Sequence, residues 1–357
     1  MMKIAIAAGG TGGHIFPALS VANYYKNKGA EVYWIGRKNS LEEKVAKENN
    51  FKFTAIKASG FKEKNPLEKM LSFMQLFVSL IQILLLFLNS KPSFLFTTGG
   101  YVSIASGIGS YILRVPLFIH EQNSIPGLAN RILSKIALLI FEGFPESFIG
   151  VSNSKYVGNP VREEVLKYLK TENLRKDHSK FNILVLGGSQ GSRQLNKIFI
   201  SSIRKLKNIQ NFNILHQCGH NDFAYLQESY LELGVDFSLK EFIEDIGKAY
   251  NDSDLVISRS GAMTVTEISA LGRPCIFLPL PWSTDNHQYK NAKHILDLGG
   301  AELVESNIEN SSELSELIMD LYLHPAKREA MSRNIKAFYE ENTLIQIYNS
   351  INESIKT

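Results

Sequence analysis

The first 160 residues alternate between short apolar runs and longer stretches in which apolar side chains recur at helical spacing. The apolar runs lie at residues 3–8, 31–36, 52–57, 93–97 and 116–120. Helical patterns at 15–28 and 40–50 separate the first three runs. Short buried strands joined by helices build a parallel sheet that is covered on both faces. We therefore expect a doubly wound α/β domain in this half of the chain.

The second half of the chain repeats this pattern. Strands are predicted at 182–186, 212–216, 254–258 and 274–280, and helices at 195–205, 288–298 and 326–355. The charged stretch 166–180 has loose apolar patterning, which is typical of a linker. The prediction is two doubly wound, Rossmann-like domains that face each other across a cleft. We assign them to residues 1–162 and 163–335, with a C-terminal helix at 336–357 that can pack back on the first domain.

Polar turns follow several of the predicted strands. In the first half these are GGTGGH at 9–14, GGYVS at 99–103 and HEQN at 120–123. In the second half they are GGSQGS at 187–192 and RSGAMTVTE at 259–267, which leads into a helix. Ligands of doubly wound sheets bind at the carboxyl ends of the strands. We therefore expect these turns to form the binding sites.

The glycine-rich turns suit a phosphorylated ligand, because glycine lets the backbone approach closely and free helix N–H groups attract anions. The first turn lacks the dinucleotide fingerprint, since Ile15 stands where the third glycine is needed. Arg37 and Lys38, instead of an acid, follow the second strand, which leaves NADP as a weaker alternative. The chain has no G-K-[ST] sequence of a P-loop.

His14 closes the first glycine turn and is the first candidate for chemistry. An ionisable side chain at this point would meet a phosphorylated ligand. Two plainer interpretations compete with this one. Glycine-rich turns also serve only to pack a strand against a helix, and a histidine there can act as a helix cap. The residues alone leave these alternatives open.

Composition narrows the class of protein. With 357 residues, 44% of them hydrophobic and 21% charged, the chain is typical of a soluble globular protein with two domains. The net charge of +4 favours acidic small ligands or an anionic surface, and it does not indicate nucleic acid. Two cysteines, Cys218 and Cys275, exclude a disulfide framework. The first apolar run is too short for a signal peptide.

Residues 70–88 contain no charge over 19 positions, which meets the length criterion for a membrane span. A span would cut a βαβ crossover in half, so two other interpretations are preferred. Ser72, Gln75, Ser79 and Gln82 form one narrow polar stripe at helical spacing. The helix either lies in the core and is wetted along that stripe, or exposes its apolar side chains to a bilayer surface. In the second case, lysines of the 64–91 region would lie near anionic headgroups.

Two patterns resemble metal sites. Asp252 and Asp254 form a D-x-D sequence, which holds a divalent ion in some sugar transferases. They precede their strand, which places them at the sheet edge away from the ligand crevice. His216, Cys218 and His220 alternate like strand residues, but no fourth ligand is near. We expect neither pattern to bind metal.

The six motifs GGTGGH, GGYVS, HEQN, GNPVR, GGSQG and RSGAMTVTE occur in this order, and with them the sequence resembles the MurG family of bacterial glycosyltransferases from end to end. The resemblance implies the two-domain GT-B fold, with the sugar nucleotide held mainly by the C-terminal half and no cofactor or metal. It implies inverting transfer of N-acetylglucosamine from UDP-N-acetylglucosamine to the 4-hydroxyl of lipid-linked N-acetylmuramyl-pentapeptide (lipid I to lipid II) in peptidoglycan synthesis. It also implies a peripheral enzyme at the cytoplasmic face of the plasma membrane.

The same resemblance carries site residues over to this chain. His14 would be the catalytic residue. The positions implied for binding UDP-N-acetylglucosamine are Thr11, Gly12, Gly13, Asn123, Arg162, Ser189, Ile243, Ala262, Met263, Thr264, Val265, Thr266, Glu267 and Gln288.

Several of these positions carry a specific implied role. Ser189 would lie near the pyrophosphate, and Ile243 would offer backbone groups to uracil. Residues 262–266 would supply helix amides, and Glu267 would accept from the ribose hydroxyls. Gln288 would contact sugar hydroxyls. The loop before it departs from the usual family pattern by carrying Trp282 and His287.

His14 suits the role of general base. Conversion of an axial UDP-sugar to an equatorial product needs one in-line displacement, and the attacking hydroxyl must lose its proton as the bond forms. Histidine has an ordinary pKa near 7, which matches this task. A helix N-terminus disfavours the charged ring and keeps it ready to accept a proton. Glu121, which also follows a strand, is the competing base.

Two other functions remain as alternatives. A glycolipid synthase with the same fold would share the loops and act on diacylglycerol. A non-catalytic sugar-nucleotide sensor would keep the C-terminal pocket but have no use for GGTGGH. Motifs in both halves of the chain favour catalysis.

Overall fold

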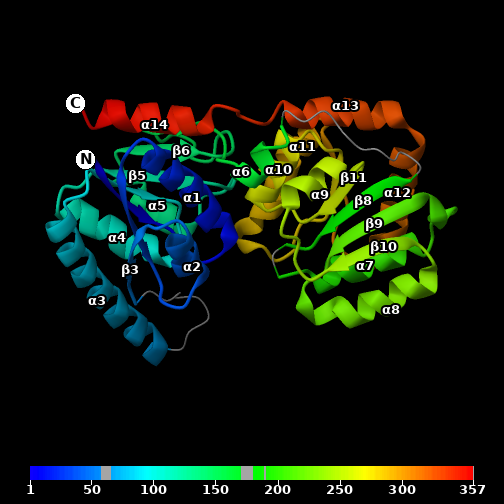
Figure 1. Cartoon of the computed structure of the whole chain (residues 1–357), viewed down its shortest axis with the longest axis horizontal. Coiled ribbons are helices and arrows are strands. Elements are labelled where there is room, and N and C mark those ends of the chain that lie inside the picture. Colours follow the sequence, from blue (N-terminus) through cyan, green and yellow to red (C-terminus); the bar gives the residue numbers. More distant parts are fainter. Residues whose placement is uncertain (58–65, 170–179, 189, 357) are drawn as a thin grey trace. The chain divides into compact units, whose positions relative to one another are not determined.

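The computed structural model describes residues 1–57, 66–169, 180–188 and 190–356, and in the helix at 66–90 the side chains from Met74 onward. The chain forms two compact units (Figure 1). Residues Met1–Pro160 and Asn342–Thr357 form the N-terminal unit, and Val161–Glu341 form the C-terminal unit. Each has its own parallel sheet and hydrophobic core, which confirms the predicted fold class.

The sheet of the N-terminal unit has the strand order β3-β2-β1-β4-β5-β6-β7. The strands are β1 (Lys3–Ala7), β2 (Glu31–Gly36), β3 (Lys52–Ala55), β4 (Phe94–Thr97), β5 (Leu117–Glu121), β6 (Leu139–Glu142) and β7 (Ser154–Tyr156), and every pairing is parallel. From β1 the chain first builds outward through β2 and β3, and then returns to add β4 on the other side of β1. Ligands of doubly wound sheets bind at such a switch point, and GGTGGH and GGYVS follow these two strands directly.

Helices cover both faces of this sheet. They are α1 (Gly12–Asn27), α2 (Leu41–Glu48), α3 (Pro66–Ser90), α4 (Tyr101–Ile112), α5 (Leu128–Leu133) and α14 (Thr343–Ser354). Alternate side chains of β1 enter opposite cores, with Ile4 and Ile6 packed on one face and Ala5 and Ala7 on the other. The first core also contains Ile347 of α14, so the end of the chain packs on the N-terminal unit.

The C-terminal unit repeats this design with the strand order β10-β9-β8-β11-β12-β13. Its strands are β8 (Phe181–Leu186), β9 (Phe212–Gln217), β10 (Asp236–Lys240), β11 (Leu255–Ser258), β12 (Cys275–Phe277) and β13 (Ala301–Leu303). Its helices are α6 (Glu163–Leu166), α7 (Arg193–Ile203), α8 (Phe223–Leu233), α9 (Ile246–Asp252), α10 (Ala262–Ala270), α11 (His287–Asp297), α12 (Ser311–Leu323) and α13 (Pro325–Lys336). The switch point lies between β8 and β11, where GGSQGS and RSGAMTVTE begin.

Several boundaries differ from the sequence-based prediction, and the differences in α1, in β5 and at the C-terminus matter most. Helix α1 begins at Gly12 instead of at residue 15, so Gly12, Gly13 and His14 lie in its first turn. Strand β5 continues to Glu121, which places part of HEQN within the sheet. The helix predicted at 326–355 is two helices, α13 and α14, because the chain leaves one unit for the other between them. Of the predicted linker 166–180, residues 170–179 lie outside the described part.

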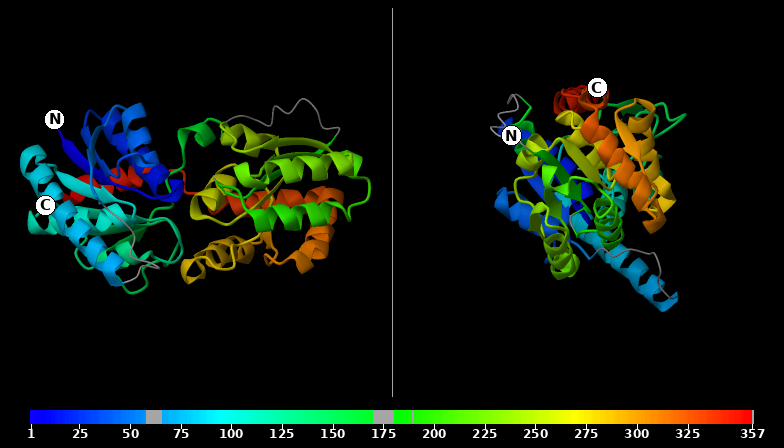
Figure 2. Two further views of the ribbon diagram at one scale, coloured as in Figure 1. Left: turned by 90° about the horizontal axis from the view of Figure 1, so that it is seen from below. Right: turned by 90° about the vertical axis from the view of Figure 1, so that its right-hand side faces the viewer.

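Helix α3 packs on α4, and Ser79 of its polar stripe turns inward while apolar side chains face outward, so the prediction of a core helix wetted along that stripe is wrong. Ser79 is fully buried, and its hydroxyl donates to the carbonyl oxygens of Gln75 and Lys57 at 2.8 and 2.9 Å. Ile83 and Phe87 share the buried side. Figure 2 shows α3 along the outside of the N-terminal unit. The outward side, here named the α3 apolar face, consists of Met74, Phe77, Val78, Ile81, Leu85 and Leu88, each 43% to 60% exposed.

Candidate active site

Two glycine loops meet at the switch point of the N-terminal unit. Gly100 has φ +86°, and a β-carbon on it would lie 2.5 Å from the Gly9 carbonyl oxygen. Gly99 has φ +97° and lies under the His14 ring. Side chains at these two positions would separate the loops, because the conformation is strained for any L-residue and the space is filled. The glycines therefore hold the first turn of α1 against the end of β4.

His14 is half-buried and fixed at both its backbone and its ring. Its carbonyl oxygen accepts from the Thr98 hydroxyl at 2.8 Å. Its ring Nδ1 lies 2.8 Å from the Thr98 carbonyl oxygen, which can only accept a hydrogen bond. Nδ1 therefore carries the proton in the neutral ring, and Nε2 carries a lone pair. A ring in this state can take a proton from a substrate hydroxyl.

Thr11, Gly12 and Gly13 lie beside this ring at the start of α1. Thr11 is the N-cap and is exposed, but its hydroxyl makes no capping hydrogen bond. The first amides of a helix have no partner within the helix. The N-terminus of α1 can therefore offer amide donors and partial positive charge to an anionic or hydroxylated substrate.

Glu121, the competing base, is buried and held by the loop that follows β5. Its carboxylate accepts from the Asn123 backbone and side-chain amides at 2.9 and 3.2 Å, the Gly127 amide at 3.0 Å and the Asn130 side chain at 2.8 Å. It is only 1% exposed. Such a carboxylate positions the loop after β5 and does not present itself to a substrate. Asn123, a position implied for donor binding, is therefore fixed by Glu121.

In the C-terminal unit, α10 begins with an N-terminus that no side chain caps. Gly261 is the N-cap. Of the implied amides, those of Ala262, Met263 and Thr264 belong to the first turn, where amides have no partner within the helix. The expectation for Val265 and Thr266 needs correction. The Val265 N–H already donates to the Gly261 carbonyl at 3.0 Å, and Thr266 continues the helix.

Arg162 and Glu267 bind each other. Arg162 Nε and Nη2 donate to the two Glu267 carboxylate oxygens at 2.7 and 2.9 Å, and the Tyr250 hydroxyl lies 3.5 Å from the second oxygen. Burial lowers the pKa of Arg162, but the charge of Glu267 and its hydrogen bonds, with smaller contributions from Tyr250 and Glu164, together raise this pKa above its usual range. Glu267 was expected to face the ribose directly. In this structure Arg162 covers it, and its carboxylate is 3% exposed.

The other implied donor contacts are only partly available. The Ile243 N–H donates to Gln217 Oε1 at 2.8 Å, which leaves the Ile243 carbonyl for uracil. Gln288 Oε1 accepts from the Leu280 N–H at 3.0 Å, so its NH₂ group is the part that can meet a sugar hydroxyl. Ser189 lies outside the described residues.

Arg259, a residue of the RSGAMTVTE motif to which the sequence pattern assigned no role, is a buried cation beside this site. It donates to the Ser192 hydroxyl at 2.7 and 3.1 Å and to the Leu278 and Pro279 carbonyls at 2.7 and 3.1 Å. Burial lowers its pKa to about 10. These acceptors are neutral, so Arg259 adds positive charge where α7 and the end of β11 meet. The sequence signal for this role was the position of Arg259 as the first residue of the RSGAMTVTE motif.

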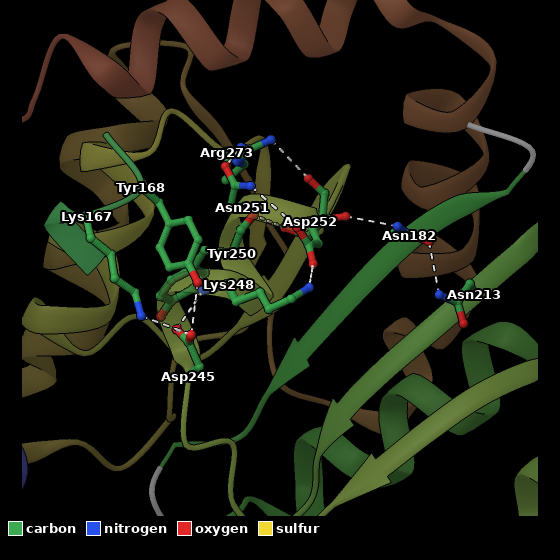
Figure 3. A network of polar contacts seen from close by, with 11 residues as sticks. Lys167, Tyr168, Asn182, Asn213, Asp245, Lys248, Tyr250, Asn251, Asp252 and Arg273 are labelled. Atoms are coloured by element: carbon green, nitrogen blue, oxygen red, sulfur yellow. Dashed lines mark hydrogen bonds and ion pairs between the residues drawn. The ribbon is translucent and has the colours of Figure 1, made fainter. Parts of the chain in front are cut away.

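The D-x-D sequence lies where it was expected, directly before β11. Figure 3 shows Asp252 in a network of polar contacts with neighbouring side chains. Asp254 accepts from the Asn182 backbone N–H at 2.8 Å, and Asp252 pairs with Lys248. His216 is buried against Tyr230 and Asn196, whereas His220 is exposed. Within the described residues, no group of three or more His, Cys, Asp or Glu side chains could hold a metal ion.

Comparisons with known proteins agree over nearly the whole chain. Residues 4–141 match the glycosyltransferase family 28 N-terminal domain, and residues 182–345 match the glycosyltransferase family 28 C-terminal domain. A Coxiella burnetii protein named UDP-N-acetylglucosamine--N-acetylmuramyl-(pentapeptide) pyrophosphoryl-undecaprenol N-acetylglucosamine transferase is 38% identical over 88% of each chain. A Colwellia psychrerythraea protein of the same name is 35% identical over 92% of this chain and 87% of its own.

Solved structures show the same relationship. The crystal structure of Acinetobacter baumannii MurG has a TM-score of 0.83 and 28% sequence identity, and covers 99% of this chain and 100% of that one. A UDP-GlcNAc 2-epimerase from Neisseria meningitidis, bound to UDP-GlcNAc, has a TM-score of 0.73 at 16% identity, which shows likeness of fold alone.

Proposed function

The chain belongs to glycosyltransferase family 28, and on this premise we propose that it transfers N-acetylglucosamine from UDP-N-acetylglucosamine to lipid-linked N-acetylmuramyl-pentapeptide. The attacking group would be the 4-hydroxyl of the muramyl sugar, and the product would be lipid II. The relatives named above carry this activity in their names. The observation that supports it most in this chain is His14, whose Nε2 lone pair is fixed at the switch point of the N-terminal unit.

The donor would bind mainly to the C-terminal unit. The uncapped N-terminus of α10 and the buried Arg259 suit a diphosphate, because both supply positive potential and no carboxylate among the described residues forms an ion pair with Arg259. The Ile243 carbonyl can accept from uracil N3–H. Arg162 and Glu267 together would hold the ribose end of the nucleotide.

The proposed function is tested by UDP release. The purified protein is mixed with UDP-N-acetylglucosamine and, separately, with lipid-linked N-acetylmuramyl-pentapeptide, diacylglycerol or no acceptor. We expect turnover with the muramyl lipid only. Turnover with diacylglycerol instead would support a glycolipid synthase, and tight donor binding without turnover on any acceptor would support a sugar-nucleotide sensor.

We also propose that turnover needs no divalent metal. Developing charge on the leaving diphosphate can be stabilised by helix amides and by Arg259. The only D-x-D sequence is engaged at the opposite end of β11. Turnover in excess EDTA should therefore stay within about twofold of the untreated rate, a change of less than about 0.5 kcal/mol in the barrier. Loss of activity in EDTA that Mg²⁺ or Mn²⁺ restores would contradict this.

The α3 apolar face suits attachment to a membrane surface. Its side chains recur along one side of the helix while the polar residues Ser79 and Gln82 lie elsewhere on it. An amphipathic helix of this kind lies in the interface plane of a bilayer. Within the part of the chain that the structure describes, no helix is long and apolar enough to cross a membrane. We infer peripheral binding to the anionic cytoplasmic face of the bacterial plasma membrane.

Charging this face should release the protein from membranes. Phe77 and Leu85 are 60% and 57% exposed, so Phe77→Asp with Leu85→Asp removes apolar contact without disturbing the core. Each buried apolar side chain contributes about 1.5–3 kcal/mol. We therefore expect partitioning onto anionic vesicles, measured by co-sedimentation, to fall at least about 100-fold.

The matched control charges equally exposed side chains of the C-terminal unit. Leu231 and Leu323 are 66% and 60% exposed, and Leu231→Asp with Leu323→Asp should leave vesicle binding unchanged. Added salt should weaken wild-type binding, since surface charges are screened beyond about 8 Å at physiological ionic strength. If the two double variants bind vesicles equally, the α3 apolar face does not attach the protein to membranes and the proposal is wrong.

A further inference from the structure

A chain of hydrogen bonds runs from the His14 ring into the core of the N-terminal unit. His14 Nδ1 lies 2.9 Å from Gln122 Oε1. Gln122 Nε2 lies 3.0 Å from His120 Nδ1 and 2.8 Å from the His120 carbonyl oxygen. His120 Nε2 lies 3.0 Å from the Gly158 carbonyl oxygen. Gln122 and His120 are 1% and 0% exposed, so neither can act on a substrate directly.

The donor and acceptor in each of these hydrogen bonds can be assigned by starting from the Gly158 carbonyl oxygen. The Gly158 carbonyl can only accept, so His120 Nε2 carries a proton. Burial lowers the pKa of His120 to about 4, and at neutral pH its Nδ1 therefore has a lone pair. This lone pair and the His120 carbonyl both require a donor. Each is met by the NH₂ group of Gln122, which leaves the Gln122 amide oxygen pointing to His14.

His14 Nδ1 is therefore surrounded by two acceptors, the Gln122 amide oxygen and the Thr98 carbonyl oxygen. Both favour a proton on Nδ1 and a lone pair on Nε2. They also stabilise the ring once Nε2 has taken a proton, because hydrogen bonds from a charged donor are roughly twice as strong as neutral ones. A 180° flip of the Gln122 side-chain amide would break both hydrogen bonds from its NH₂ group to His120, so the amide oxygen stays directed to His14.

We propose that Gln122, oriented by His120, is a positioning residue that holds His14 in its Nδ1–H tautomer and stabilises the charged ring as it accepts the substrate proton. The inference rests on the proposed function, since it assigns His14 the proton of the attacking hydroxyl. No atom of Gln122 contacts the substrate. Its effect reaches the reaction only through the ring of His14.

The kinetic test uses Gln122→Met, which keeps the length of the side chain and removes the amide. Loss of a hydrogen bond to a charged group should lower kcat about 10- to 100-fold. The KM for UDP-N-acetylglucosamine should stay within about twofold, a change of less than about 0.5 kcal/mol, since the donor is held by the other unit. An unchanged kcat, in a variant with the thermal midpoint of the wild type, would overturn the proposal.

Gln217→Met provides the matched comparison in the C-terminal unit. Gln217 is also a buried amide, and it joins the Ile243 N–H to the Gly188 carbonyl at 2.8 Å each. Its loss should disturb the loop around Ile243, whose carbonyl is proposed to accept from uracil, and so raise the donor KM, with a smaller effect on kcat. If both variants lower kcat and raise KM alike, Gln122 has only a structural role and the proposal fails.

A spectroscopic readout separates this inference from the proposed function. With ¹⁵N-labelled histidine, and His14→Ala to assign the signals, NMR reports which ring nitrogen of His14 carries the proton. We expect Nδ1–H in the wild type and a larger share of Nε2–H in Gln122→Met. An Nε2–H ring in the wild type would overturn the inference even if the protein is an active transferase. The Nδ1–H ring in a protein that releases no UDP would count against the proposed function alone.

Discussion

His14→Ala should lower kcat by about 10²- to 10⁴-fold, the usual contribution of a positioned general base. The ring has its Nδ1 fixed by the Thr98 carbonyl at 2.8 Å, so its Nε2 is the basic atom at the carboxyl edge of the sheet. Alanine cannot take the proton of the attacking hydroxyl. Donor binding should persist within about twofold, or about 0.5 kcal/mol, because the groups assigned to the donor lie mainly in the C-terminal unit.

The controls separate loss of the base from loss of the fold. His324→Ala removes an exposed histidine that pairs with Asp320 on the C-terminal unit, and it should keep the wild-type kcat. Glu121→Gln tests the competing base, because glutamine cannot act as a general base but still has a side-chain oxygen that can accept the hydrogen bond from Asn130. If His14→Ala keeps a near-normal kcat while Glu121→Gln abolishes it, the base is Glu121.

Breaking the Arg162–Glu267 pair should raise the donor KM about 10- to 150-fold, which corresponds to the 1.5–3 kcal/mol of a hydrogen bond to a charged group. Glu267→Gln keeps the shape and removes the charge, whereas Arg162→Lys keeps the charge and loses the two parallel bonds. Either change leaves a buried charge poorly paired, so both variants should also be less stable. The measurements are steady-state KM and calorimetric binding of UDP.

The double variant shows whether the two side chains act as a unit. Residues in direct contact commonly couple by about 0.5–3 kcal/mol, so the combined loss should be smaller than the product of the single losses. Asp297→Asn, which breaks the exposed pair of Lys293 and Asp297 on α11, should not change the KM. If the increase in donor KM of the double variant equals the product of the increases for Arg162→Lys and Glu267→Gln, the ion pair does not bind the donor as one group.

The sequence predicted nine of the strands that the structure describes, because buried parallel strands are short apolar runs bounded by glycine turns. It missed β6, β7, β10 and β13. Strands β7 and β13 are only three residues long, and β10 alternates polar and apolar residues at an edge of its sheet. The sequence did not predict where α1 begins. Glycine is a poor helix former, yet Gly12 and Gly13 open this helix, and Thr98 after β4 holds His14 in its first turn through two hydrogen bonds. Tertiary contacts decided the boundary, and they are not visible in the local pattern.

Other parts of the site depended on distant residues. A polar stripe at helical spacing does not say which side faces the core, and Ser79 turns inward because carbonyl oxygens of Gln75 and Lys57 accept its hydroxyl. Arg162 and Glu267 are 105 positions apart, so their pairing could not be predicted. Gln122 stood in the quoted HEQN motif, but only the positions of His120 and His14 give its amide a role.

The central claim is that one in-line displacement, assisted by a base on His14, moves the sugar from UDP to the acceptor. The most direct measurement is the anomeric configuration of the new linkage, read by NMR on the isolated product together with the amount of UDP released. UDP-N-acetylglucosamine is an α-glycoside, so the account predicts a β-linked product and one UDP for each linkage. An α-linked product would contradict it, because a single in-line displacement always inverts the anomeric centre.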